Sequence, residues 1–306
     1  MWFLFALITT LAWGFADLFY KKSNREDERY SHLKTSITVG IVMGAHAGLT
    51  ILINGIDYSF INILKYLPVS AMYIISMTVG YFGLRYLELS VSSPVQNSSG
   101  AVTCILCLVF LKQKIGYASA LAILLISAGV ILLGVFEKKR EKEAEDKENR
   151  KYKIGFVAFF MPIIYCVIDS LGTFFDAYYL DDFSTTPLVN ATPDNLENVA
   201  NISYELTFFI VAVILFVYVR FIKKEPFDFP KRKSGFAAAV FETAGQMTYV
   251  YAMSGLAVAA APMISAYSIV AVLLSAVFLK ERLTKKQYIS VALVMAGIII
   301  LGIFDA

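Results

Sequence analysis

The fold is decided by two stretches that repeat each other: residues 110–136 read FLKQKIGYASALAILLISAGVILLGVF, and residues 278–304 read FLKERLTKKQYISVALVMAGIIILGIF. Aligned without gaps at an offset of 168, they share ten identities in 27 positions. The same offset pairs Tyr81 with Tyr249. Self-similarity at a fixed spacing indicates that one structural unit is used twice.

The beginning of the unit is repeated as well. Trp13-Gly-Phe-Ala-Asp17 pairs with Tyr165-Cys-Val-Ile-Asp169 at an offset of 152, so the second copy holds 168 − 152 = 16 extra residues. An acidic loop after the sixth apolar run has room for them. We therefore divide the chain into a first unit at 1–136, a charged linker at 137–153 and a second unit at 154–306.

The composition indicates that both units lie in lipid. Of 306 residues, 58% are hydrophobic and 17% are charged, and the mean hydropathy is +0.65. Soluble domains are nearer 45–50% apolar and about 25% charged. The apolar residues recur in runs of about 20, which is the length of a helix that crosses a bilayer. Ten such runs occur, at 2–20, 35–53, 66–84, 92–111, 117–135, 154–175, 204–221, 235–253, 257–279 and 288–304.

The predicted fold class is an all-α polytopic membrane protein with ten transmembrane helices, arranged as two five-helix inverted-topology repeats. Because five is odd, the second copy enters the membrane with the opposite orientation to the first. Inverted repeats are typical of secondary transporters, in which two pseudo-symmetric halves expose one central site to each side in turn.

The distribution of Lys and Arg predicts the orientation. The connections from odd-numbered to even-numbered runs hold 24 of the 27 basic residues, and the other connections hold 3. Basic flanks remain in the cytoplasm. We therefore expect a multi-pass protein of the cell (inner) membrane with both termini outside.

Three short motifs carry a family resemblance: Ala12-Trp13-Gly14, Phe278-Leu-Lys-Glu-Arg-Leu283 and Ala296-Gly-Ile-Ile-Ile-Leu-Gly302. The chain resembles the drug/metabolite transporter superfamily, specifically its ten-span EamA-like members. The resemblance implies a transporter and leaves the solute open among amino acids, sugars, nucleotide sugars, amines and other metabolites. The first unit departs from the pattern at Leu111-Lys-Gln-Lys114, where the family has an acid.

Three acidic residues lie within apolar runs: Asp17, Asp169 and Glu242. An acid at the centre of a span costs about 2.5–3.5 kcal/mol on insertion scales, so we expect these groups to face a wet cavity or to be protonated. The alternative for the two aspartates is that they only anchor helix ends. Gln246 and Tyr249 follow Glu242 at i+4 and i+7 and share its helix face.

Several further polar or aromatic residues are candidates for substrate binding or proton coupling. Trp13, Tyr81 and Tyr267 could surround an amine through cation–π contacts, or could simply pack. Asn97 lies in a polar turn after Pro94. His46 stands among three glycines at four-residue spacing, so it is a proton relay or a packing residue.

The predicted function is a proton-coupled carrier of a small polar metabolite, neutral or cationic, because the apolar runs contain acids and no central base. A carrier of sugars or of anionic metabolites such as nucleotide sugars is the alternative, and a non-transporting receptor is a third. No cofactor, metal site or enzymatic motif is expected. The expected partners are a small-molecule substrate, membrane lipid and protons, in a monomer or homodimer, and the charge pattern excludes nucleic acid.

The orientation can be tested by fusing a reporter after Ala306. A reporter that is active only outside the cytoplasm should be active at this position, because the basic connections keep the opposite face of the protein in the cytoplasm. Cytoplasmic activity at this position would overturn the assignment.

Overall fold

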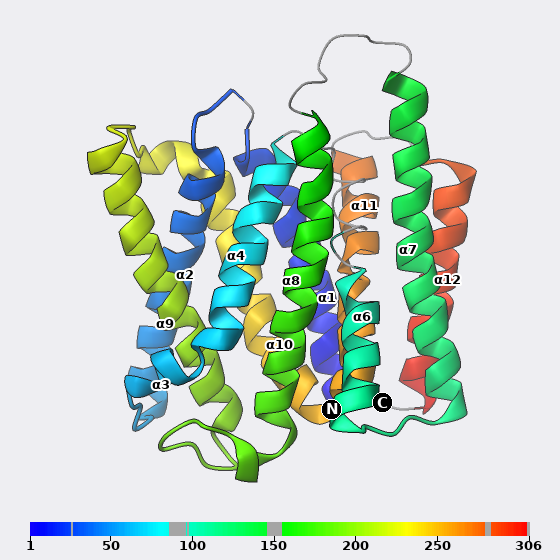
Figure 1. The fold of residues 1–306 in the computed structure, drawn as a ribbon, viewed down its shortest axis with the longest axis horizontal. Coiled ribbons are helices and arrows are strands. Elements are labelled where there is room, and N and C mark those ends of the chain that lie inside the picture. The colour runs from blue at the N-terminus through cyan, green and yellow to red at the C-terminus, as the bar shows by residue number, and fades with distance from the viewer. Residues whose placement is uncertain (26, 86–95, 97, 146–154, 279–282, 305–306) are drawn as a thin grey trace.

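The computed structural model describes residues 1–25, 27–85, 96, 98–145, 155–278 and 283–304, and within these ranges it contains helices and no strand (Figure 1). The helices stand side by side, and both termini lie at the same end of the bundle. The helices are α1 (Trp2–Ser23), α2 (Ser31–Asn54), α3 (Ile61–Lys65), α4 (Leu67–Leu84), α6 (Ser99–Leu106), α7 (Tyr117–Glu145), α8 (Gly155–Asp181), α9 (Leu196–Val217), α10 (Lys233–Ser265), α11 (Tyr267–Phe278) and α12 (Lys285–Phe304). Short π- or 3-10 turns continue or join them: η1 (Cys107–Leu111), η2 (Phe183–Thr185), η3 (Tyr218–Ile222) and η4 (Phe229–Arg232).

These helices suit a bilayer, because a helix satisfies its own backbone hydrogen bonds where no water can do so. Seven described stretches are long and apolar enough to cross a membrane, and one of them, Phe229–Phe278, runs for 50 residues. That length exceeds the roughly 20 residues of one crossing. The expected span at 92–111 lies partly outside the described residues, and its described helix, Ser99–Leu111, is shorter than a full crossing. The count of ten spans therefore stays a prediction.

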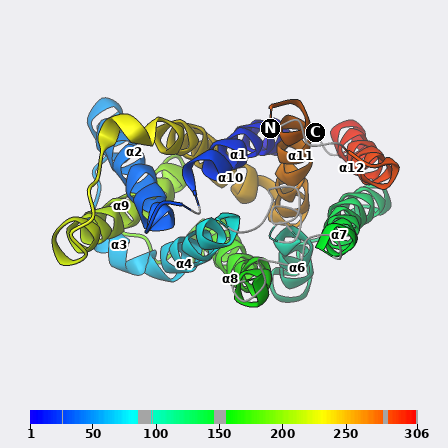
Figure 2. The ribbon, with the colours of Figure 1, turned by 90° about the horizontal axis from the view of Figure 1, so that it is seen from above.

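The helices form two facing rows with a helix pair at each end. Seen from above, α1, α10 and α11 lie opposite α4, α8 and α6 (Figure 2). The pair α2–α9 lies at one end and the pair α7–α12 at the other. The most extensive packing joins α1 to α10, α4 to α8, α2 to α9 and α7 to α12.

Helix α10 contains a break that the sequence pattern anticipates between residues 253 and 257. Leu256 has non-helical torsion angles, φ −159° and ψ 80°. The backbone N–H of Val258, which begins the new segment, donates to the Gln113 Oε1 atom at 2.9 Å, and the Gln113 amide also donates to Asp181. Gln113 thus caps a buried helix start. This gives a structural role to the residue that departs from the family pattern.

The contact between α7 and α12 depends on two glycines that are 168 positions apart. A Cβ atom on Gly129 would lie 2.6 Å from Val294 Cγ2 and 2.9 Å from the Ser290 carbonyl oxygen. A Cβ on Gly297 would lie 2.6 Å from Ile126 Cγ1 and 2.7 Å from the Ala122 carbonyl oxygen. The absence of side chains lets the two backbones approach closely, as small residues do in membrane helix pairs.

The glycines around His46 differ from one another. Gly40 and Gly44 lie directly against α9, where added Cβ atoms would come within 2.3 Å of the Phe208 carbonyl oxygen and 2.5 Å of the Phe209 ring. A Cβ on Gly48 would meet no atom within 4 Å. The spacing therefore predicts a packing face correctly for its first two members only.

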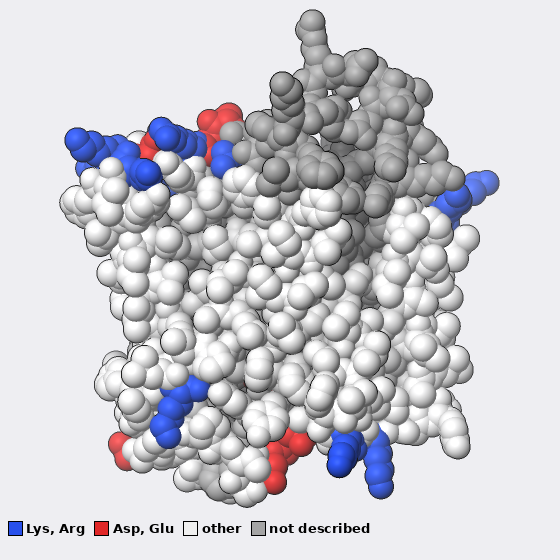
Figure 3. Space-filling view, viewed as in Figure 1, with Lys and Arg blue, Asp and Glu red and all other residues white. Residues whose placement is uncertain are grey.

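Charged side chains gather at the two ends of the bundle, and the band between them is almost free of charge (Figure 3). The connection from α1 to α2, which holds Arg25 and Arg29, lies at the end opposite the termini. The turn that precedes α10 holds Lys231 and Arg232. Which end faces the cytoplasm stays a prediction from the positions of Lys and Arg.

We predict that Gly297→Ala lowers the stability of the protein by about 1–3 kcal/mol, because its Cβ meets a backbone carbonyl oxygen that cannot rotate away. The melting temperature in detergent should fall. Gly48→Ala is the matched control, since that position is open and alanine is the better helix former. Equal melting temperatures for the two variants would contradict the proposed close contact.

Candidate functional site

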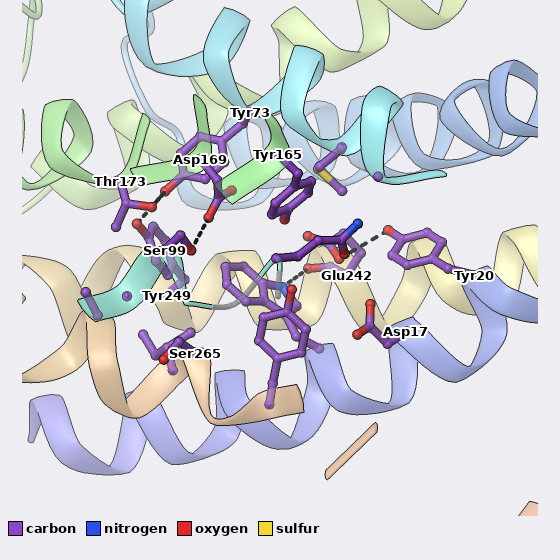
Figure 4. Close-up of a pocket in the computed structure, with 18 of the residues that line it drawn as sticks. Asp17, Tyr20, Tyr73, Ser99, Tyr165, Asp169, Thr173, Glu242, Tyr249 and Ser265 are labelled. Atoms are coloured by element: carbon purple, nitrogen blue, oxygen red, sulfur yellow. Dashed lines mark hydrogen bonds between the residues drawn. The ribbon is translucent and has the colours of Figure 1, made fainter. Parts of the chain in front are cut away.

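A polar pocket lies between the two helix rows. The space between its walls that no atom occupies is about 770 Å³, including the open solvent at its mouth. Its walls come from α1, α4, α6, α8, α9, α10 and α11 (Figure 4). The polar and aromatic side chains of the lining are Trp13, Asp17, Tyr20, Tyr73, Tyr81, Gln96, Ser99, Tyr165, Asp169, Thr173, Tyr204, Glu242, Tyr249, Ser265 and Tyr267.

One face of α1 supplies Trp13, Asp17 and Tyr20, at i, i+4 and i+7. The Trp13 ring stacks on Tyr249 at a centroid distance of 5.1 Å, and its Nε1 atom donates to the Glu242 carbonyl oxygen at 3.3 Å. This stacking is possible because residue 245 is glycine: a Cβ there would lie 2.4 Å from Trp13 Cδ1. The packing of α1 against α10 therefore fixes an indole face at the pocket wall.

Glu242 and Asp17 occupy one end of the pocket together with Tyr20 (Figure 4). The Tyr20 hydroxyl donates to Glu242 Oε2 at 3.1 Å. The Tyr20 ring also packs on Tyr81, with centroids 4.6 Å apart. Among the described residues, nothing forms a hydrogen bond with the buried Tyr81 hydroxyl. That hydroxyl and the second oxygen of Glu242 are thus available to a bound molecule or to water.

Asp169 lies closer to the other end, where its partners are neutral. Ser99 Oγ donates to Asp169 Oδ2 at 2.8 Å, and Ser76 Oγ donates to Oδ1 at 3.4 Å. Nearby, the Tyr73 hydroxyl lies 2.8 Å from Thr173 Oγ1 and 2.6 Å from the Tyr249 hydroxyl. Serine, threonine and tyrosine hydroxyls can donate or accept. This end can therefore rearrange its hydrogen bonds around either form of the carboxyl group.

The charges of the pocket are all of one kind. Its described lining holds three carboxyl groups, at Asp17, Asp169 and Glu242, and no Lys, Arg or His. Buried carboxylates are costly unless an opposite charge or a proton neutralises them. Eight tyrosine and tryptophan rings surround them, at residues 13, 20, 73, 81, 165, 204, 249 and 267. Aromatic faces attract cations, so the arrangement favours a cation or protons over an anion.

The sequence-predicted residues fall into three groups. Trp13, Asp17, Tyr81, Asp169, Glu242, Tyr249 and Tyr267 line the pocket. Gln246 is buried on α10 but is not part of the lining, and its Oε1 atom has no partner. Asn97 lies outside the described residues.

His46 lies away from the pocket, in contact with a buried acid that the sequence analysis missed. Its Nδ1 atom is 2.9 Å and 2.8 Å from the two oxygens of Glu205 on α9. Asn201 Nδ2 donates to Glu205 Oε1 at 3.1 Å. Glu205 is fully buried, although in the sequence it stands one residue inside an expected span and resembles an interfacial acid. The pair joins α2 to α9.

The sequence analysis also missed several hydroxyl groups of the pocket. Tyr20 continues the helical spacing of Trp13 and Asp17, and Thr173 continues that of Tyr165 and Asp169. The same i, i+4, i+7 rule that grouped Glu242 with Tyr249 would have found Tyr20. Tyr73 and Tyr204 have no such signal, because no acidic residue shares their helix face within one turn.

With this geometry established, comparison with known proteins places the chain. Residues 1–135 and 195–303 match the EamA-like transporter family. The chain belongs to the EamA-like transporter family. It is therefore a multi-pass membrane transporter of the drug/metabolite type, with a small-molecule substrate, and not a member of an enzyme family. No match was found among curated proteins.

Solved structures support this fold for the whole chain. One, titled only "Crystal structure of protein", aligns with a TM-score of 0.65 and covers 98% of this chain and 96% of its own. The identity is 14%, so the likeness concerns the fold alone. Within the chain, the family match leaves out residues 136–194. Helix α8, with Tyr165, Asp169 and Thr173, thus lies outside the region that identifies the family.

At the end opposite the termini, Glu28 joins the α1–α2 connection to the turn before α10. Its carboxylate accepts hydrogen bonds from Lys34 Nζ, at 2.8 Å, and from the Arg232 guanidinium. The Arg85 guanidinium donates to its backbone carbonyl oxygen at 3.1 Å. Partial burial raises the pKa of Glu28, but the two cationic donors outweigh burial and hold the pKa below its ordinary value.

We predict that Glu28 makes the stability dependent on pH. A carboxyl group with a lowered folded-state pKa stabilises the fold above its unfolded pKa of about 4.3 and loses that effect as the pH falls through the folded value. The melting temperature in detergent should therefore fall more for wild type than for Glu28→Gln between pH 7 and acidic pH. Parallel curves for the two proteins would contradict this role.

Proposed function

We propose that this transporter carries a small neutral or cationic, amine-bearing metabolite across the cell membrane by alternating access, coupled to protons. The observation that carries the proposal is the pocket: three buried carboxyl groups, aromatic walls, and no basic side chain in its described lining. A phosphate or carboxylate substrate would require Arg or Lys donors at this position.

The amine would bind at the end of the pocket where Asp17 and Glu242 meet the aromatic rings. Glu242 keeps one oxygen free of the Tyr20 bond, and the Trp13 ring forms an adjacent wall. A cation on an aromatic face gains about 2 kcal/mol or more when desolvated. The Tyr81 hydroxyl, which has no partner in the protein, offers an additional acceptor for an N–H group.

Proton coupling follows from competition for the same carboxyl groups. Glu242 accepts a hydrogen bond from a tyrosine and Asp169 accepts two from serines, and neither is paired with a basic side chain among the described residues. Either a proton or an ammonium group can neutralise them, and the two exclude each other. Binding on one side of the membrane and release on the other would therefore exchange protons for substrate, in either direction.

Helix packing supports the two inverted repeats that alternating access requires. The two offsets make α8 the repeat counterpart of α1, and the first part of α10 the counterpart of α4. Under this correspondence the contact between α1 and α10 becomes the contact between α8 and α4. The pairs α2–α9 and α7–α12 each map onto themselves. The corresponding rings Trp13 and Tyr165 each pack on a glycine of the facing helix, Gly245 and Gly80, although the two glycines themselves are not at equivalent positions.

A sugar carrier is the second candidate, because aromatic faces and amides also suit a polyhydroxylated ring. Gln96 Nε2 is buried without a partner beside the pocket, and Ser99 and Ser265 line it. In a sugar carrier, the three carboxyl groups would bind protons and not the substrate. Anionic sugars such as nucleotide sugars fit less well, for want of basic groups in the described lining.

The first test is a thermal-shift screen of the purified protein against amines, amino acids, sugars and nucleotide sugars. We expect amines to raise the melting temperature, because only they neutralise the carboxyl groups. The compound with the largest shift is then followed in proteoliposomes under an imposed pH gradient. Glu242→Gln and Asp17→Asn should each reduce gradient-driven uptake at least tenfold.

Asp228→Asn is the control, since that carboxylate lies on the loop before α10 and pairs with Lys231. Unchanged uptake in both pocket variants would refute the proton assignment. Stabilisation by sugars and not by amines would favour the second candidate. A melting shift without exchange of substrate across the membrane would refute transport.

A further inference from the structure

A fourth carboxyl group lies beyond the pocket, on the same helix as Asp169. Asp176 follows Asp169 by seven residues on α8 and is only 1% exposed. The Tyr66 hydroxyl, also 1% exposed, donates to Asp176 Oδ1. The second oxygen, Oδ2, is buried and has no hydrogen-bond partner in the part of the chain that the structure describes. The pocket lining does not include Asp176.

Hydroxyl groups connect the pocket wall to this carboxyl group. Tyr249 and Tyr73, both in the lining, have hydroxyls 2.6 Å apart, and Tyr73 lies 2.8 Å from Thr173 Oγ1. The Tyr249 hydroxyl lies close enough to the Asp176 carboxyl group for the two to interact electrostatically. Figure 4 shows Tyr73, Thr173 and Tyr249 together at the end of the pocket away from Asp17. The side chains of Tyr73, Thr173 and Tyr249 come from α4, α8 and α10. Together with Tyr66, which stands just before α4, they form a continuous polar layer.

The layer lies between the pocket and the end of the bundle that carries the termini. Asp176 is five residues before the end of α8, about 7.5 Å by helical rise. Tyr66 stands immediately before α4, at the same end. Both side chains are nearly inaccessible to solvent, so this layer closes the pocket from that side in the conformation described.

The groups around Asp176 do not include a counter-ion. Among the described residues, no Lys, Arg or His forms an ion pair with it. The nearest lysine in sequence to Tyr66, Lys65, donates instead to the Pro187 carbonyl oxygen at 2.7 Å. The titratable residues on the elements packed around Asp176 are Tyr66 just before α4, Tyr73 of α4, Tyr249 of α10, Tyr204 of α9, Asp169, Tyr179 and Asp181 of α8, and Cys104 and Cys107 beside them.

We propose that Asp176 is a second proton-binding site of the transport pathway, reached from the side of the termini. In this conformation the layer of Tyr66, Tyr73, Thr173 and Tyr249 covers it; when that layer opens, the Asp176 carboxylate takes a proton from external water and becomes a carboxylic acid. On closure, Asp176 returns to its carboxylate form as the proton passes to the neighbouring Tyr249 hydroxyl and on through the Tyr73 and Thr173 hydroxyls, each of which accepts one proton and donates another, to a carboxylate or a water molecule in the pocket. This inference rests on the proposed proton coupling.

A buried carboxylate with one oxygen unsatisfied is an expensive means of holding helices together, since a neutral amide would accept the same Tyr66 bond without a charge. The free-energy cost of burying this carboxylate is understandable if Asp176 binds and releases a proton during each transport cycle. Glu205 offers the contrast within the same bundle: His46 and Asn201 satisfy both of its oxygens.

The test labels buried carboxyl groups with dicyclohexylcarbodiimide, which reacts with the protonated form, in sealed vesicles whose external face carries the termini. Mass spectrometry of the peptides measures the label at Asp176 while the external and internal pH are varied separately. We expect the label to fall at least tenfold as the external pH rises from 6 to 9 and to change less than twofold with the internal pH. The label at Glu205 is the internal control and should respond to neither.

Two variants make the assignment unambiguous. Asp176→Asn keeps the size and the Tyr66 acceptor and should remove the label from this peptide alone. Tyr66→Phe removes the donor but keeps the ring, and should increase the label at Asp176 at least twofold at external pH 6. Labelling of Asp176 that follows the internal pH, is independent of pH, or is absent would overturn the inference.

The uptake and labelling experiments together distinguish failure of the proposed function from failure of the Asp176 inference. If no compound gives gradient-driven uptake by wild type while Asp176 still responds to the external pH, the substrate coupling is wrong and the external proton site stands. If uptake is proton-driven and Asp176 does not respond, the inference alone is wrong.

Discussion

The arrangement of this protein depends on the exclusion of carboxyl groups from lipid. Five acids of the described residues lie buried within the bundle: Asp17, Asp169, Asp176, Glu205 and Glu242. Each is less than a tenth exposed, so α1, α8, α9 and α10 all turn their acidic faces inward. This requirement fixes the rotation of four helices, and the apolar residues on their other faces then remain for lipid. The central pocket exists because three of these faces converge.

The partners of the buried acids determine what the site can do. At the surface, Glu28 has a lysine and an arginine, which stabilise its charged form. In the pocket, the described side chains that donate to Glu242 and Asp169 are all hydroxyl groups. A hydroxyl group can donate to a carboxylate or accept from a carboxylic acid, so the surrounding hydrogen bonds tolerate a change of charge. Salt bridges at these positions would have prevented such a change.

Much of the fold and part of the site could be predicted from the sequence. Apolar runs of membrane length predict helices because lipid offers the backbone no alternative, and the helical spacing of Glu242 and Tyr249 predicts a shared face. Contacts between distant helices carry no such local signal. Glu205 looked like an interfacial residue until α2 placed His46 against it. The break at Leu256 falls where the apolar pattern pauses, whereas its cap by Gln113 depends on a loop 145 positions away.

The number of spans shows the same limit. Hydropathy separates the expected spans at 235–253 and 257–279, and the non-helical Leu256 divides α10 (Lys233–Ser265) at the same place, but hydropathy does not indicate the further turn at Ala266. Hydropathy measures how apolar a stretch is and does not register how the backbone bends within it. Pro262 and the serines that follow it indicate such bending, although they do not say where each segment crosses the bilayer.

The stacking of Trp13 on Tyr249 has a practical consequence. The chain contains two tryptophans, and the other, Trp2, lies at the start of α1 against Gly255. In a Trp2→Phe background, intrinsic fluorescence would come from an indole on the pocket wall, already in contact with a tyrosine ring. The Trp13 emission would change when a molecule enters between these rings, and again when water replaces that molecule. The protein thus contains its own optical reporter of occupancy, with no label required.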